Sequence, residues 1–223
     1  FSKYLNSADM MQSLSVELVT DLMGALAKNG KATLAVPGGS TPGPLFDLLS
    51  LADFDWTNVT IMLTDERWVS TDSPRSNTAL IKNRLLVNAA ASANYVALYK
   101  DGFEPQSGAV ALSKQVEPHL PLDVILLGMG ADMHTASLFP GAAELALAQS
   151  PEATAVVSMV PVTGDLEPRV TLSANVLEAA IRTHVLILGD EKKAALMVAE
   201  TAAPSEAPIA QFLPNAKVHW SPS

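Results

Sequence analysis

Apolar residues recur along the chain with two different periods. In the first segment, leucine or methionine stands at every fourth position up to the pair Asn29-Gly30: Met10, Leu14, Leu18, Leu22 and Leu26. This spacing predicts an amphipathic helix, and the Asn-Gly pair is its stop signal. Five later runs are short, almost continuously apolar and rich in β-branched residues, which is typical of strands covered on both faces. They occupy 32–36, 59–63, 123–127, 155–160 and 184–188.

Segments with a helical pattern separate these runs. They lie at about 43–51, 76–88, 108–117, 174–182 and 191–201. Strands that alternate with helices indicate βα units, so the sequence predicts an α/β fold with a mostly parallel sheet and helices on both faces. No internal repeat, low-complexity tract or linker interrupts residues 1–223, which predicts a single domain.

Composition narrows the classes of partner. The 223 residues carry 14 Lys and Arg against 23 Asp and Glu. No stretch of the sequence clusters enough Lys or Arg to contact the phosphate backbone of a nucleic acid, so we expect no nucleic-acid partner. Because the chain has a net charge of −9, its overall field repels anions, so an anionic ligand would need a few basic side chains that converge on it locally. No apolar run approaches the roughly 20 residues that span a bilayer, so no membrane partner is expected. Without cysteine or a signal-peptide pattern, the chain is expected to be cytoplasmic.

Three predicted strands end in polar or glycine-rich turns, which read PGGSTP, TDERW and GMGADMH. In open α/β sheets, ligands bind outside the carboxyl ends of the strands, so these turns are expected to converge on one crevice. The first turn, with Gly38, Gly39, Ser40 and Thr41, precedes a helix and could cradle an anion, although a plain connecting turn fits too. The second, with Asp65, Glu66 and Arg67, could equally be a solvated loop.

His134 is the candidate for acid–base chemistry, because imidazole titrates near neutral pH. Asp132 could orient its ring, while a capping or core role for the histidine stays open. The spacing of Gly128 and Gly130 does not complete a dinucleotide-binding fingerprint. The other histidines, at 119, 184 and 219, have no polar cluster beside them in the sequence, and no spacing of ligand residues indicates a metal.

Two further basic residues stand beside predicted strand ends or turns, Arg169 and Lys192. Surface ion pairing is the ordinary role of such residues. In an acidic chain, their positions also fit a local phosphate clamp.

Taken in order, PGGSTP, TDERWV, SN, GMGADMHTASLFPG, PRVTLS and GDEKK closely resemble the 6-phosphogluconolactonases of the glucosamine-6-phosphate isomerase/6-phosphogluconolactonase family. The resemblance covers residues 36 to about 196. DMHTASLFPG is its most specific part, whereas GGSTP is shared with the related glucosamine-6-phosphate deaminases. Those deaminases carry Tyr where Arg67 stands.

The resemblance implies a Rossmann-like domain of the phosphosugar isomerase/CoA-transferase kind that hydrolyses 6-phospho-D-glucono-1,5-lactone to 6-phospho-D-gluconate, in the oxidative pentose phosphate pathway, without a cofactor. His134 would be the general base and Asp132 its orienting partner, with backbone N–H groups near Gly128 to Gly130 stabilising the oxyanion. The implied substrate-binding set is Gly38, Gly39, Ser40, Thr41, Asp65, Glu66, Arg67, Asn77, Gly130, Arg169 and Lys192.

One residue departs from the family pattern: Met133 stands where Asp-Gly-His is usual. If that position has a positive φ, Met costs about 1 to 2 kcal/mol there. A phosphosugar deaminase or isomerase and a non-catalytic sugar-phosphate sensor remain as alternatives. We expect a monomer or a weak homo-oligomer.

Overall fold

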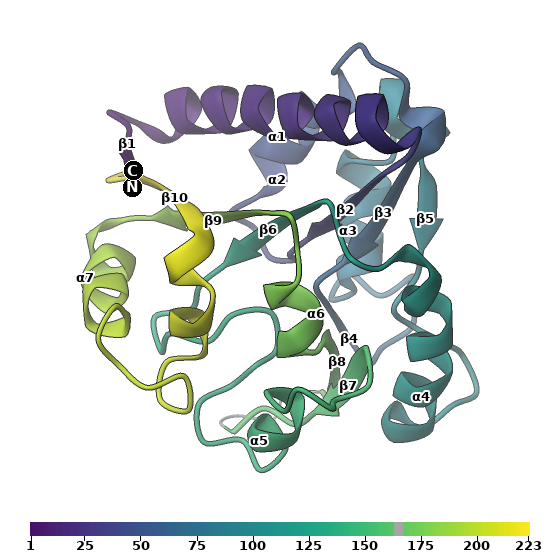
Figure 1. Ribbon diagram of the computed structural model, residues 1–223, viewed down its shortest axis with the longest axis vertical. Coiled ribbons are helices and arrows are strands. Elements are labelled where there is room, and N and C mark those ends of the chain that lie inside the picture. Colours follow the sequence, from purple (N-terminus) through teal and green to yellow (C-terminus); the bar gives the residue numbers. More distant parts are fainter. Residues whose placement is uncertain (163–166) are drawn as a thin grey trace.

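The computed structural model describes residues 1–162 and 167–223 and contains one large and one small β-sheet (Figure 1). All strand pairs of the large, seven-stranded sheet are parallel. Its order is β1 (Ser2–Lys3), β10 (Ala216–Ser221), β9 (Arg182–Leu188), β6 (Val124–Gly128), β2 (Ala32–Val36), β3 (Val59–Leu63) and β5 (Asn94–Val96). The predicted parallel α/β sheet is thereby confirmed.

The small sheet is antiparallel and consists of β4 (Asp65–Arg67), β8 (Arg169–Leu172) and β7 (Val156–Met159). The apolar run 155–160, which has the pattern of a strand in the large sheet, is therefore a strand of the small one. Thr64 joins the two sheets, because its N–H donates to the Val36 carbonyl and its own carbonyl accepts from Leu172. The small sheet consequently forms a wall beside the carboxyl ends of β2 and β3.

Apart from the short α5 (Leu145–Ala148), which was not predicted, the described helices follow the predicted segments with some differences in length. The other α-helices are α1 (Ser7–Asn29), α2 (Gly43–Ser50), α3 (Asn77–Arg84), α4 (Pro105–Val116), α6 (Ala174–Glu178) and α7 (Asp190–Ala199). Short 3₁₀ helices occur at η1 (Trp56–Asn58), η2 (Asn88–Ser92), η3 (Glu117–His119), η4 (Pro208–Gln211) and η5 (Leu213–Asn215). The helix predicted to reach residue 88 ends at Arg84, and Asn88, which has a positive φ, begins the separate 3₁₀ helix η2.

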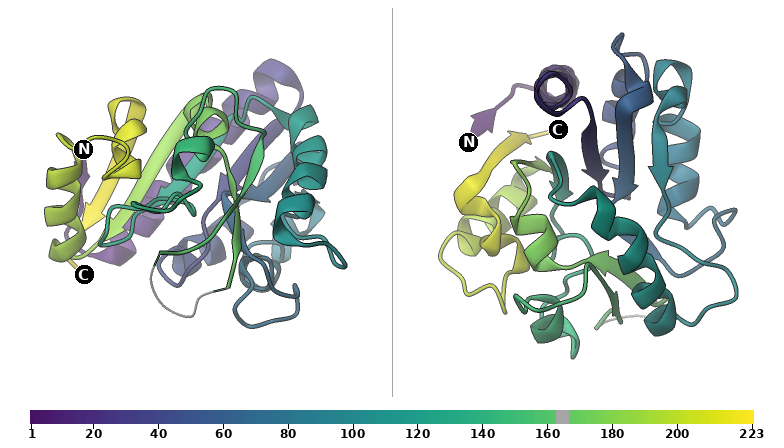
Figure 2. Two further views of the ribbon diagram at one scale, coloured as in Figure 1. Left: turned by 90° about the horizontal axis from the view of Figure 1, so that it is seen from below. Right: turned by 45° about the vertical axis from the view of Figure 1, so that its right-hand side comes forward.

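The long helix α1 forms where the four-residue repeat predicts it. The Asn6 side chain caps its first turn by accepting from the Asp9 N–H, and Gly30 ends it at a φ of 70°. The repeat buries Met10, Leu14, Leu18 and Leu22 completely, and Leu26 at the end of the helix only partly. Figure 1 shows α1 above the large sheet and α6 and α7 below it, and the right-hand view of Figure 2 shows α1 nearly end-on.

The order of the strands places a crevice at the centre of the sheet. From β2 the chain moves outward through β3 to β5, and it then returns to β6 on the other side of β2 and continues to β9 and β10. The carboxyl ends of β2 and β6 therefore flank a topological switch point, where open parallel sheets bind ligands. None of the described helices combines the length and the apolar character that crossing a membrane would require.

Candidate active site

A pocket of about 380 Å³ opens at this switch point. The turns after β2 and β6, the small sheet and the start of α7 all contribute to its lining. Eleven of the predicted site residues line it: Gly38, Gly39, Ser40, Thr41, Asp65, Arg67, Asn77, Gly130, His134, Arg169 and Lys192. Residues that are separated by more than 150 positions thus meet in one cavity, as the convergence of strand ends predicts.

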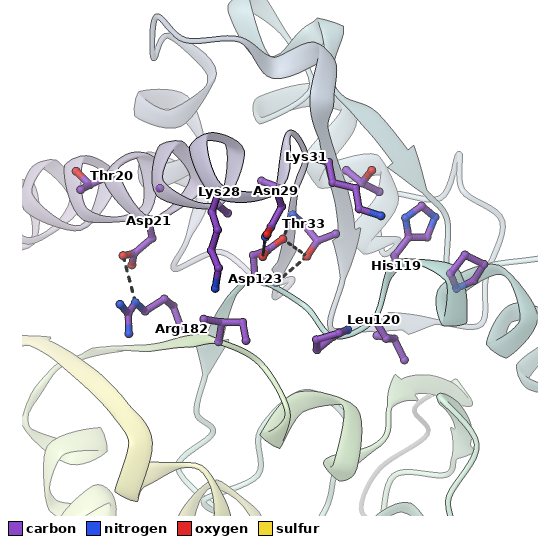
Figure 3. A pocket seen from close by; sticks show the side chains of 17 residues that line it. Thr20, Asp21, Lys28, Asn29, Lys31, Thr33, His119, Leu120, Asp123 and Arg182 are labelled. Carbon is purple, nitrogen blue, oxygen red and sulfur yellow. Dashed lines mark hydrogen bonds and ion pairs between the residues drawn. The ribbon is translucent and has the colours of Figure 1, made fainter.

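A larger cavity of about 600 Å³ lies at the opposite, amino-terminal edge of the sheet (Figure 3). Its central polar groups satisfy one another: Asp123 Oδ2 accepts from the backbone N–H of Thr33 at 2.8 Å and from its hydroxyl at 3.1 Å. Asp21 lies 3.6 Å from Arg182. Neither the glycine-rich turns nor His134 reaches this cavity, so the smaller pocket is the candidate active site.

The turn after β2 is built for close approach of the backbone to a ligand. A Cβ atom on Gly38 would lie 2.0 Å from the Asn77 side-chain oxygen, so only glycine leaves room for Asn77. Gly39 has a φ of 86°, which other residues rarely adopt. The turn leads into α2, and no side chain of the described residues caps that helix. The Gly43 N–H is bonded to the Ser40 carbonyl and Pro42 and Pro44 have no N–H, so the N–H groups that a ligand could meet here belong to the turn itself.

The imidazole of His134 is held in one orientation by Asp132. Nδ1 of the ring lies 2.5 Å from Asp132 Oδ1, and this hydrogen bond holds the pKa of the Asp132 carboxyl below its ordinary value, against the effect of burial. Since a carboxylate only accepts hydrogen bonds, Nδ1 carries the proton and Nε2 keeps its lone pair. Asp132 itself does not line the pocket. The hydrogen bond between Asp132 and His134 that the sequence predicted is present in the structure.

The loop between Gly130 and His134 is tightly closed. The Gly130 N–H donates to the His134 carbonyl at 3.0 Å, and the Met133 N–H donates to the Gly130 carbonyl at 3.0 Å. A Cβ atom on Gly130 would lie 2.3 Å from the His134 ring. Met133 has a φ of 65°, so the condition under which methionine is costly at this position is met.

Two arginines of the small sheet form the cationic wall of the pocket. Arg67 and Arg169 are direct partners in the β4–β8 register, and like charges placed opposite each other destabilise a sheet. In the part of the chain that the structure describes, the Nε atoms of both are buried without a hydrogen-bond partner. Burial lowers the pKa of Arg169, an effect that Asp65 opposes and Arg67 reinforces. This arrangement favours an anionic ligand between the two guanidinium groups.

Lys192 adds a third cation from the first turn of α7. Asp65 also lines the pocket; it is buried and accepts from the Ser137 hydroxyl at 2.6 Å. Sequence reasoning missed this serine, together with Phe139, whose ring centroid lies 5.0 Å from that of His134. Both belong to the segment after His134, and only the folded loop shows that they support the pocket.

Glu66, unlike most of the predicted substrate-binding residues, does not line the pocket. Its side chain is completely buried, and its oxygens accept from the Ser76 hydroxyl and from the backbone N–H groups of Asn77 and Thr78. A carboxylate at this point caps the N-terminus of α3, where its negative charge interacts favourably with the positive end of the helix dipole. The interpretation of Glu66 is therefore corrected to a supporting residue, and Asn77, which Glu66 positions, lines the pocket.

The fold and the site together define an α/β protein with a cation-lined pocket beside an oriented imidazole at the switch point of a parallel sheet. The chain belongs to the family described as glucosamine-6-phosphate isomerases/6-phosphogluconolactonase, whose model matches residues 5–220.

Similar proteins include a 6-phosphogluconolactonase of Rhizobium meliloti (strain 1021), which is 37% identical over 97% of this chain and 96% of that protein. One of Neisseria meningitidis serogroup A is 39% identical over 93% and 90% of the two chains. The crystal structure of a 6-phosphogluconolactonase from Shewanella baltica superposes with a TM-score of 0.95 at 33% identity, covering 99% of this chain and 97% of that one.

Proposed function

We propose that this protein is a 6-phosphogluconolactonase, which hydrolyses 6-phospho-D-glucono-1,5-lactone to 6-phospho-D-gluconate in the oxidative pentose phosphate pathway. The observation that carries the proposal is the pairing of an oriented imidazole with a cluster of cations in one pocket. The full-length likeness to 6-phosphogluconolactonases selects this phosphosugar lactone among anionic substrates. The enzyme acts in the cytoplasm, as a monomer or a weak homo-oligomer.

The cations bind the phosphate of the substrate. Arg67 and Arg169 approach it from the small sheet and Lys192 from α7, while the turn from Gly38 to Thr41 offers backbone N–H groups. These contacts lie away from the lactone carbonyl, so they position the reacting group rather than activate it.

His134 carries out the chemistry as a general base. Its Nε2 takes a proton from a water molecule as the water oxygen attacks the lactone carbonyl carbon. When the tetrahedral intermediate collapses, the bond from that carbon to the ring oxygen breaks, and the ring oxygen takes the proton from the imidazolium to become a hydroxyl group. Asp132 stabilises the charged ring meanwhile. The Gly130 N–H is bonded to the His134 carbonyl, so Gly130 contributes space and not the expected oxyanion contact.

The direct test is the hydrolysis of freshly generated 6-phosphogluconolactone, measured against its spontaneous opening in the same buffer. We expect saturable turnover above that background and no ammonia release from glucosamine 6-phosphate. Ammonia release would instead show a deaminase. Saturable binding of 6-phosphogluconate without turnover of either compound would show a sugar-phosphate sensor and reject the proposal.

A further inference from the structure

A second cluster of ionisable side chains lies between α1 and the edge of the large sheet. His184 of β9 and His219 of β10 face Glu17 and Asp21, two carboxylates one turn apart on α1. Both rings are buried, with 4% and 0% exposure. None of these residues lines the pocket that contains His134. The sequence assigned no polar neighbours to these histidines, and tertiary packing supplies them.

Three atoms of the cluster that could bind a metal ion lie close together. His184 Nδ1 lies 3.0 Å from His219 Nε2, and this nitrogen lies 3.9 Å from Glu17 Oε2. One ligand atom from each of the three residues lies within 4.8 Å of the other two. Tetrahedral zinc with bonds of about 2.0–2.1 Å separates neighbouring ligand atoms by roughly 3.3 Å. The two measured separations, 3.0 Å and 3.9 Å, lie on either side of that ligand–ligand distance, so small side-chain adjustments bring the three atoms to a common centre.

The outer nitrogen of each ring already has a hydrogen-bond partner. Asp21 Oδ2 lies 2.9 Å from His184 Nε2, and since a carboxylate only accepts, the His184 proton sits on Nε2 and its Nδ1 lone pair faces the cluster. Tyr4 Oη lies 3.0 Å from His219 Nδ1 and can accept a proton from it. Moving the His219 ring proton from Nε2 to Nδ1 therefore presents a second lone pair. Carboxylate or hydroxyl partners of this kind orient the histidine ligands of metal sites.

We propose that Glu17, His184 and His219 form a binding site for a divalent transition-metal ion of the zinc type, oriented by Asp21 and Tyr4. The two imidazoles and one carboxylate match the ligand preference of this ion, and solvent occupies the fourth position. The ion would join α1 to β9 and β10 at the edge where both chain termini lie (Figure 1), so its role is structural. Lys217 Nζ lies 2.8 Å from Glu17 Oε2 and competes with the ion for this carboxylate.

The test is a zinc titration of the intact protein at neutral pH, by calorimetry and equilibrium dialysis. We expect one tightly bound zinc ion per chain. Asp21→Asn should weaken its binding about 10- to 100-fold, because the His184 ligand loses its orienting carboxylate. Glu17→Gln should weaken it further, because a charged ligand is lost. Lys217→Met should have the opposite effect and strengthen binding, since it removes the competing cation.

Two other histidines supply matched controls. His119→Gln changes a residue of the larger cavity, and His134→Asn removes the imidazole of the candidate active site; both should retain full zinc affinity. Loss of binding in His134→Asn would place the ion in the active site and overturn the proposal. So would equal affinities for the wild type, Glu17→Gln and Lys217→Met, or the absence of saturable binding at micromolar zinc. The Glu17 and Lys217 side chains are partly exposed, so these two variants remain decisive if changes at the buried histidines prevent folding.

Discussion

His134 owes its proposed role to a neighbour two residues away. Asp132 fixes which ring nitrogen is protonated, and the absence of a side chain at Gly130 leaves room for the ring. We expect His134→Asn to lower kcat for 6-phosphogluconolactone about 10²- to 10⁴-fold, a barrier increase of roughly 3 to 5 kcal/mol. Binding of 6-phosphogluconate, measured by calorimetry, should persist because the cations are untouched. Near wild-type turnover after subtraction of spontaneous hydrolysis would exclude His134 as the base.

Met133 carries backbone strain directly beside the proposed catalytic pair, Asp132 and His134. At its φ of 65°, a residue with a Cβ atom is disfavoured and glycine is not. We therefore expect Met133→Gly to be more stable than Met133→Ala by about 1 kcal/mol, the reverse of the usual order of the two residues. Turnover of the glycine variant should be unchanged or higher. Urea unfolding of the two variants measures the difference, and an alanine variant as stable as the glycine variant would contradict it.

At the level of strands and helices, the pocket exists because separate elements end at one place. Lys192 comes from α7, and the phosphate contact proposed for it would contribute about 1.5 to 3 kcal/mol, or roughly 10- to 150-fold in affinity. Lys192→Met should therefore raise KM for the phosphorylated lactone by that factor and leave the kinetics with unphosphorylated gluconolactone unchanged. Lys193→Met is the matched control, because Lys193 lies 4.0 Å from the centre of the Trp220 ring. An equal loss with both lactones would reject a phosphate contact.

The start of α3 depends on a buried carboxylate. Glu66 accepts hydrogen bonds from the first N–H groups of the helix, and bonds to charged groups contribute about 1.5 to 3 kcal/mol each. Glu66→Gln places an amide donor among donors, so we expect the free energy of unfolding to fall by about that amount. Chemical denaturation would measure the loss. A variant of unchanged stability but raised KM would return Glu66 to the substrate-binding set.

Over the whole molecule, the core runs from α1 through the large sheet to the small one. Leu18 is completely buried in this core, whereas Val16 of the same helix is 56% exposed. Leu18→Ala should lower the free energy of unfolding by about 2 to 5 kcal/mol, with little effect from Val16→Ala. If residues 1–223 form a single domain, calorimetry of both variants should show one transition. Separate transitions, with only one shifted by Leu18→Ala, would show two folding units.

The sequence by itself predicted the elements with a strong local signal and the edge of the sheet where they meet. The four-residue repeat of α1 and the apolar runs of β2, β3, β6 and β9 arise because residues close together in the sequence are buried together. A short stretch of sequence is therefore enough to detect them. The convergence of the motif turns follows because parallel strands end at a common edge.

Only the tertiary structure decided which side chains face one another across that framework. The pairing of Arg67 with Arg169, the burial of Glu66 and the assembly of His184 with His219 depend on contacts between distant segments. The apolar run of β7 could not reveal its antiparallel partner, because burial on both faces gives the same pattern in either sheet. Strand register sets the direction of every side chain, and distant partners fix it through pairing that no local window contains.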